Sequence, residues 1–262
     1  MKAKLQYSIH TLALASLFSA SSLQGATIFS IVADAVWETN TDWSGAAPKV
    51  VPGTTLSQVD VAGVNGGRKL TLNSDASGAG TISTMNVGNQ NPGTAVSTFT
   101  MTSLASLSVT TNFYVGPNGS AGHFIYNDGA SLSTATFLMG RNNGANGAPA
   151  SSTVTIALGT AGLTNAIGTT TLNLRQLEAG QNLIIDASSY TGSAGDIDLI
   201  TFTNRTGGDF NSVSITGLDA GLAGAVSYDA DSVNLNITSV PEPSSTALLG
   251  LGGLALIFRR RK

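Results

Sequence analysis

The chain has 262 residues, with fifteen acidic and twelve basic side chains, two histidines and no cysteine. The lack of cysteine excludes disulfides, a cysteine nucleophile and a Cys/His metal site. The excess of acidic side chains argues against binding to nucleic acid or to anionic lipid surfaces, since both attract basic proteins.

The first 26 residues have the layout of a secretory signal peptide. Lys2 and Lys4 precede an apolar stretch over residues 9–23, and the small residues Gly25 and Ala26 follow. A basic start, an apolar segment and a small-residue end are typical of a segment that directs export and is then removed. We therefore expect residues 1–26 to be absent from the mature protein.

Residues 27–75 are expected to form an N-terminal cap and the first coils of the fold. They contain both tryptophans of the chain, Trp37 and Trp43. Because a large aromatic side chain buries a large apolar area, we interpret both as packing over the open end of a β structure. The alternative is that their rings stack on a sugar.

Residues 76–170 are expected to form the repeats of the body. Between Asp75 and Arg175 the only formal charges are Asp128 and Arg141. Apolar residues nevertheless return at every second position in short segments, which is typical of strands that bury one face. These segments are bounded by Gly and Asn, and they cover residues 97–101, 105–109, 123–126 and 153–156.

The predicted strands also recur in a fixed order. Gly88, Gly116 and Gly140 each follow a short apolar segment and open a loop rich in Gly, Asn or Pro. An aromatic residue then lies eight positions before a leucine, in the pairs Phe99/Leu107 and Phe124/Leu132. A fixed unit with variable loops is typical of stacked coils. The sequence therefore predicts an all-β fold, a right-handed parallel β-solenoid (β-helix) with capping strands; a β-sandwich of meandering hairpins is the alternative.

Residues 171–239 are expected to form a C-terminal β closing region. Acidic residues concentrate in this part, and its predicted strands are spaced more widely than those of the repeats. An open solenoid end would offer unpaired backbone groups to other chains, so a covering unit is needed. The predicted strands cover residues 171–174, 183–186, 196–200, 213–215 and 233–237.

The last segment, residues 240–262, combines three features in order. Pro241, Glu242 and Pro243 come first, and an apolar run over residues 246–258 follows. The run is shorter than the roughly twenty residues that span a bilayer, and it contains three glycines. The chain ends in a basic cluster that would stay on the cytoplasmic side of a membrane, formed by Arg259, Arg260, Arg261 and Lys262.

This arrangement closely resembles the PEP-CTERM sorting signal of bacterial exported proteins. The resemblance covers residues 240–262 only, and it implies recognition and cleavage near the Pro-Glu-Pro motif by a membrane-embedded exosortase. Before this cleavage the protein would be inserted transiently in the inner membrane through its tail. After it, the protein would reach the cell surface or the extracellular space. The alternative is a weak C-terminal membrane anchor. Loss of both ends would leave fourteen acidic against six basic side chains, a net charge of −8.

Few residues of the mature chain could carry catalysis. His123 is the only histidine left after removal of the signal peptide, so a Ser-His-Asp triad would have to use it. Two carboxylate pairs, Asp196/Asp198 and Asp229/Asp231, could serve acid/base chemistry on a glycan or hold calcium with backbone carbonyls. Solvated strand faces or turns explain these pairs more simply. We therefore expect no catalytic residue, no metal site and no cofactor.

Two functions from different classes follow from these observations. The closing region is similar to that of β-helix repeat surface proteins of the PEP-CTERM and autotransporter type, which implies a non-enzymatic structural protein of the cell surface or extracellular matrix. Association with exopolysaccharide is a further implication of the resemblance. The alternative is a carbohydrate-binding or carbohydrate-active β-helix delivered by the same tail. A cluster of acids and bases on one solenoid face would favour the alternative, and the repeats show none.

Overall fold

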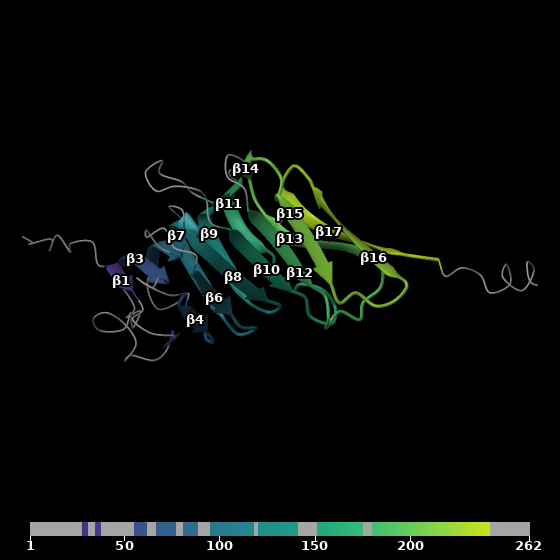
Figure 1. Cartoon of the computed structure of the whole chain (residues 1–262), viewed down its shortest axis with the longest axis horizontal. Helices are drawn as coiled ribbons and strands as arrows, with labels where there is room; N and C mark the ends of the chain where they lie inside the picture. Colours follow the sequence, from purple (N-terminus) through teal and green to yellow (C-terminus); the bar gives the residue numbers. More distant parts are fainter. Residues whose placement is uncertain are drawn as a thin grey trace, which may run out of the picture.

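The computed structural model describes residues 28–30, 35–37, 55–61, 67–76, 81–88, 95–117, 120–140, 151–174 and 180–241. These residues form strands, turns and bends, with no α-helix among them. The strands lie in two sheets that run side by side along the molecule (Figure 1). From β1 to β13 each sheet takes every second strand of the chain, so the backbone passes from one sheet to the other and back.

The first sheet begins with the odd-numbered strands from β1 to β13, in the order in which they follow along the chain, and it is completed by β14, β16 and β17. Consecutive members from β1 to β13 are parallel neighbours. They are β1 (Ile28–Ser30), β3 (Thr55–Val61), β5 (Thr81–Val87), β7 (Ser106–Val115), β9 (Ser131–Met139), β11 (Ile167–Leu174) and β13 (Gly195–Thr201).

The second sheet is parallel throughout, and all but its last member are even-numbered strands. It contains β2 (Ala35–Val36), β4 (Lys69–Leu72), β6 (Val96–Met101), β8 (Ala121–Asn127), β10 (Ser152–Ala157), β12 (Gln181–Asp186) and β15 (Ser212–Thr216). A chain whose strands alternate between two sheets, and pair parallel within each sheet, forms a β-solenoid. The prediction of this fold is therefore confirmed. A sandwich of hairpins would instead pair consecutive strands antiparallel.

The inward positions of successive coils stack into columns. Phe99 of β6 pairs with Phe124 of β8, and their rings lie stacked with centroids 5.7 Å apart. Leu107 of β7 pairs in the same way with Leu132 of β9. All four side chains are buried, with at most 2% of their surface exposed. The repeat assignment made from the sequence is therefore confirmed at these residues.

The glycine of each repeat lies at a corner between the sheets. Gly88, Gly116 and Gly140 have φ angles of 86°, 67° and 69°, in the region that favours glycine. Each donates its backbone N–H to a valine carbonyl of the preceding coil: Gly88 to Val61, Gly116 to Val87 at 2.8 Å, and Gly140 to Val115. At Gly116 a Cβ would also lie 2.1 Å from Oγ of Ser152. The corner therefore needs glycine for both conformation and space.

The odd strands bend midway along their length. The register between β7 and β9 shifts between Val109 and Asn112, and β7 is bulged there. In the next two coils a buried threonine occupies the bend: Thr134 donates to the Thr136 carbonyl, and Thr169 donates to the Thr171 carbonyl at 3.0 Å. These hydroxyls bond backbone carbonyls at the bends of β9 and β11, where the regular ladder is interrupted.

Tryptophan packing at the N-terminal end is as expected for Trp37. Its side chain is 5% exposed, and its ring lies 6.4 Å from that of Phe99. Its backbone N–H donates to the Thr71 carbonyl at 2.8 Å. Trp43 lies outside the described residues.

The C-terminal end departs from the parallel pattern. In this coil the position of the bend is occupied by a break between two separate strands, β13 and β14 (Asn204–Gly207). Strand β13 pairs with the first half of β11, and β14 pairs with the second half. Strand β17 (Ser232–Ser239) then pairs antiparallel with β13 on one side and with β16 (Leu222–Tyr228) on the other. The predicted capping strands are therefore present. Parallel stacking itself continues beyond residue 170, through β12 and β15, to Thr216.

Candidate functional site at the C-terminal end

The predicted sorting segment begins where the backbone hydrogen bonds of the solenoid end. Val240 follows β17 and donates its N–H to the Gly221 carbonyl at 2.7 Å. Pro241, the next residue, is exposed and cannot donate a backbone hydrogen bond. Figure 1 shows the chain leaving the body beyond the end of β17. Glu242 and Pro243 lie outside the described residues, as do the four predicted cytoplasmic-stop residues: Arg259, Arg260, Arg261 and Lys262.

Strand β17 holds this exit point in place. It is an interior strand of its sheet, paired over residues 232–237 with β13 and over residues 233–239 with β16. Its side chains Val233, Leu235 and Ile237 are buried in the core, with at most 2% exposed surface. The alternation of apolar and polar residues in this strand explains why it closes the core. The tail is therefore attached to one of the best-packed strands of the solenoid end.

Two groups of carboxylates lie beside β17. Asp196 hydrogen-bonds to the Asn236 side-chain amide, and Asp198 lies two residues further along β13. Asp229 accepts from Nδ2 of Asn234 at 2.6 Å, in the turn that also contains Asp231. The two predicted carboxylate pairs thus lie on different elements, one on β13 and one in the turn between β16 and β17, and each has a member beside Asn234. Each pair is exposed and has a member bound to an asparagine, which favours the structural interpretation of these acids.

A cation and an aromatic ring lie at the end of β17 that is remote from the tail. The guanidinium of Arg205 lies 4.7 Å from the centroid of the Tyr228 ring and 3.0 Å from Oδ1 of Asp209. The Tyr228 hydroxyl accepts the backbone N–H of Phe210 at 3.0 Å, and burial raises the pKa of this phenol. These contacts hold the turn before β15 against β16.

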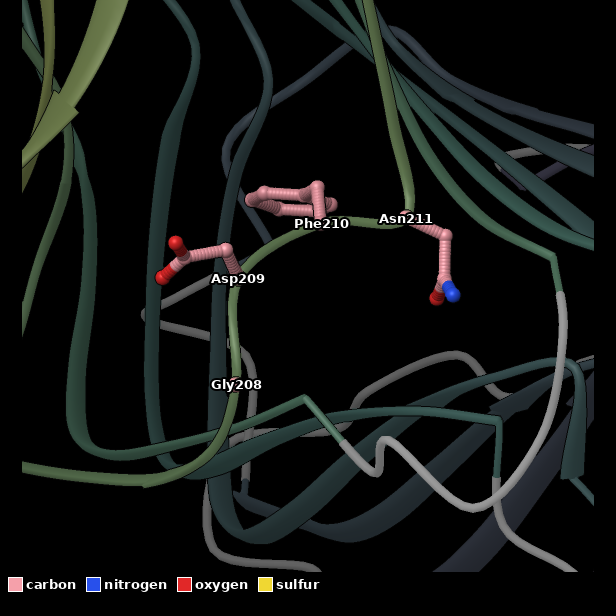
Figure 2. Close-up of a pocket in the computed structure, with 4 residues that line it drawn as sticks. All are labelled: Gly208, Asp209, Phe210 and Asn211. Atoms are coloured by element: carbon pink, nitrogen blue, oxygen red, sulfur yellow. The ribbon is translucent and has the colours of Figure 1, made fainter.

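An open hollow of about 420 Å³ lies beside this turn, lined among the described residues by Gly208, Asp209, Phe210 and Asn211 (Figure 2). Figure 2 shows the side chains of Asp209 and Asn211 on opposite sides of the chain. Oδ1 of Asn211 accepts the backbone N–H of Gln181 at 3.4 Å. The described lining therefore offers no convergent set of polar groups for a ligand.

His123 lies on the outer face of β8. Its Nε2 is 2.8 Å from Oγ1 of Thr155, and burial lowers the pKa of the imidazole. No hydrogen bond joins it to a carboxylate within the part of the chain that the structure describes. A relay of the Ser-His-Asp type needs such an acid to orient the imidazole. In this surrounding the ring serves as one member of an outward-facing polar column.

One buried acid, Asp60, has no marker in the local sequence pattern. Asp60 in β3 is 2% exposed; its Oδ1 accepts from Nδ2 of Asn86 at 2.6 Å and from Nε2 of Gln58 at 2.8 Å. Burial raises the pKa of this carboxyl, against the opposing effect of the two amides. Asp60 pairs with Asn86 one coil later, and each precedes a valine at the corner. In the sequence, Asp60 and Asn86 each come directly before a valine, Val61 and Val87. That shared position could have indicated that the two polar side chains meet in neighbouring coils.

Among the residues that the structure describes, no three His, Asp or Glu side chains gather in a way that could hold a metal ion. The described residues also include no helix of the length and apolar character that crossing a membrane requires. The apolar run over residues 246–258 is outside this range.

Comparison with known protein families gave one match. The model of the PEP-CTERM protein-sorting motif matches residues 239–262, which starts at the last residue of β17. Neither the curated proteins nor the solved structures gave a match. A PEP-CTERM signal implies export and sorting to the cell surface by an exosortase-type enzyme. The chain is therefore an exported protein with a β-solenoid body and a C-terminal PEP-CTERM sorting signal.

Proposed function

We propose that the mature protein is a non-enzymatic structural component of the cell surface or extracellular matrix, and that it associates with exopolysaccharide. The observation that carries this proposal is the outer face of the parallel even-strand sheet. Thr98 and Thr100 of β6 and Thr153 and Thr155 of β10 point outward and are half-buried by their neighbours. Such a face presents hydroxyl groups in regular rows.

The chemistry of this face suits contact with a neutral, hydroxyl-rich polymer. Neighbouring strands lie about 4.8 Å apart and alternate residues of a strand about 6.7 Å apart, so the hydroxyls are closely and evenly spaced. His123 and Ile125 lie between the two threonine pairs, and burial favours the uncharged form of the histidine. A face of this composition exerts little long-range attraction on ionic ligands, and its contacts are hydrogen bonds and apolar packing.

The position of the tail supports the sorting part of the proposal. Cleavage after Val240 removes no strand and no described hydrogen bond of the solenoid, because Pro241 is exposed. The apolar run over residues 246–258 inserts transiently in the inner membrane, with the basic cluster 259–262 on the cytoplasmic side. An exosortase then cuts near Pro241-Glu242-Pro243, and the folded body is released or transferred to the surface.

Two measurements test the proposal together. Fractionation of the producing cells, with mass spectrometry of the mature C-terminus, should find the protein outside the membrane fraction and shortened near residue 241. The purified mature protein should co-sediment with the exopolysaccharide of the same cells. Incubation with the protein should leave the chain length of the polysaccharide unchanged. A mature chain that still ends at Lys262 would refute the sorting mechanism. Cleavage of the glycan that disappears on His123→Gln, Asp196→Asn or Asp229→Asn would instead support the enzyme alternative.

A further inference from the structure

Two columns of outward side chains cross the even-strand sheet from β6 to β15. Strands β6, β8, β10 and β12 lie side by side (Figure 1), and in each the outward residues alternate with buried inward ones. We call the two aligned sets of outward residues the outer columns. Along the second column a hydroxyl residue and an isoleucine alternate from strand to strand. The parallel registers align the first column as Thr98, His123, Thr153, Asn182 and Ser212, and the second as Thr100, Ile125, Thr155, Ile184 and Ser214.

The outer columns carry no formal charge. Their histidine, His123, is uncharged at neutral pH because burial lowers the pKa of its imidazole. Charged residues lie at the margins of the columns: Lys69 of β4 is in register with Thr98, and Asp186 follows two residues after Ile184. Because these two margins have opposite sign, the face exerts little net attraction on a charged polymer.

The hydroxyls of the outer columns are available to a ligand. Among the described residues, the hydroxyls of Thr98, Thr100 and Thr153 make no hydrogen bond within the body, whereas those at the bends of β9 and β11 bond backbone carbonyls. Oγ1 of Thr155 lies 2.8 Å from Nε2 of His123. A hydroxyl can both donate and accept, so this oxygen keeps a further bonding position for a ligand.

The alternation repeats over a length that fits a flat polysaccharide. Neighbouring strands lie about 4.8 Å apart, so Ile125 and Ile184, which are two strands apart, are separated by roughly 9.6 Å. Each hexose of an extended β-1,4-linked glycan advances by about the spacing of one strand. Alternate sugars therefore recur with the period of the second column. Since the faces of a pyranose ring are lined by C–H groups and its edge carries hydroxyls, isoleucine suits the ring face and threonine suits the edge.

We propose that the outer columns bind a neutral polysaccharide of extended β-1,4-linked hexoses, whose chain crosses the strands along the solenoid. This inference rests on the proposed function and names the class of glycan that the face takes. Ile125 and Ile184 pack against every second sugar, and Thr100, Thr155 and Ser214 hydrogen-bond the sugars before, between and after them. A flexible chain does not keep this spacing, and an anionic chain finds no row of cations to compensate it.

The first test compares three soluble polymers by affinity electrophoresis in native gels, with protein purified from the producing cells. Glucomannan is neutral and β-1,4-linked, carboxymethylcellulose has the same linkage and is anionic, and dextran is neutral with a flexible α-1,6 linkage. Glucomannan should retard the protein at concentrations on the order of tenfold lower than the other two polymers. Equal retardation by dextran, a preference for carboxymethylcellulose, or no retardation by glucomannan would overturn the proposal.

Paired exchanges of threonine and isoleucine test the spacing while the composition of the face stays constant. The variant T100I/I125T places the two isoleucines three strands apart, and T155I/I184T places them on neighbouring strands. The quadruple variant that combines both exchanges restores a separation of two strands, moved by one strand along the column. Each exchange alone should weaken the retardation by glucomannan about tenfold, and the quadruple variant should recover most of it. Equal retardation of all four proteins would show that composition, not spacing, governs binding and would overturn the proposal.

The exchanged side chains all point outward, so each variant should keep the circular dichroism of the wild type. T155I/I184T removes the hydrogen bond between Thr155 and His123, whereas T100I/I125T leaves it intact. Should the former lose stability, T100I/I125T alone decides, and undiminished retardation of this folded variant would count against the proposal.

Co-sedimentation with the exopolysaccharide of the producing cells separates this inference from the proposed function. If the wild type binds that exopolysaccharide but glucomannan does not retard it, the inference is wrong and the proposed function stands. If the wild type binds neither polymer, both are wrong.

Discussion

Replacing Phe124 by alanine tests whether the stacked aromatic column holds the solenoid together. The ring is fully buried, and its centroid lies 4.8 Å from that of Phe113, 5.7 Å from Phe99, 6.0 Å from Tyr126 and 6.1 Å from Phe137. Removing a buried phenylalanine side chain costs about 3–5 kcal/mol, as lost transfer energy and cavity formation add. Several aromatic contacts are lost at once, so we expect the upper half of this range.

The assay is equilibrium unfolding in urea, with the free energy of unfolding extrapolated to water. The matched control is Ile125→Ala on the same strand, because Ile125 is the next residue and faces outward with its side chain half-buried. We expect this control to cost about 1 kcal/mol or less. If Phe124→Ala costs no more than Ile125→Ala, the assignment of inward and outward positions on β8 is wrong.

Three further predictions concern the corner, the histidine and the tail. Gly116→Ala should destabilise the body by about 1–3 kcal/mol, since the residue has a positive φ and its new Cβ would meet Oγ of Ser152; G116A/S152G should recover part of the loss in the same urea assay, and no recovery would locate the strain elsewhere. Burial lowers the pKa of His123, so the stability that the neutral imidazole contributes is present at neutral pH and declines as the pH falls below 6.5, the ordinary pKa of histidine. His123→Gln should therefore reduce the fall of the melting temperature between pH 7 and pH 5, and an unchanged slope would contradict this. Glu242→Ala should leave tail insertion intact but block processing, so that uncleaved protein accumulates in the membrane fraction on immunoblots; normal processing would show that Glu242 is not part of the recognised motif.

The sequence was sufficient to predict the solenoid because its markers were large and regularly placed. Phe99 and Phe124 are both aromatic, and each lies eight residues before a leucine, so the repeat is visible in the sequence. The same column continues with Val154, Leu183 and Val213, at intervals of 30, 29 and 30 residues. These residues are smaller and of mixed type, and the corners between them vary in length. The alternation of apolar residues beyond residue 170 predicts strands, but it does not show that these strands continue the parallel coils.

Other features depend on contacts that no local pattern records. The bend of the odd strands is built by Thr134 and Thr169, whose hydroxyls bond backbone groups two residues ahead, and threonine is common throughout the chain. The burial of Asp60 likewise depends on amides from its own strand and from the next coil. In the candidate site, the Pro-Glu-Pro spelling predicted the sorting motif directly.

The corner glycines also make the molecule suitable for carrying foreign peptides. Gly140 ends one strand with a bonded N–H, and the chain re-enters the next coil at Ser152, which is in register with Gly122. The geometry of the coil is therefore complete on both sides of residues 141–151, and the cost of lengthening such a connection grows only slowly with its length. An epitope inserted after residue 145 should be displayed on the outside of the cell while the coils fold unchanged. The sorting signal would then deliver a designed antigen or enzyme tag on a scaffold without disulfides.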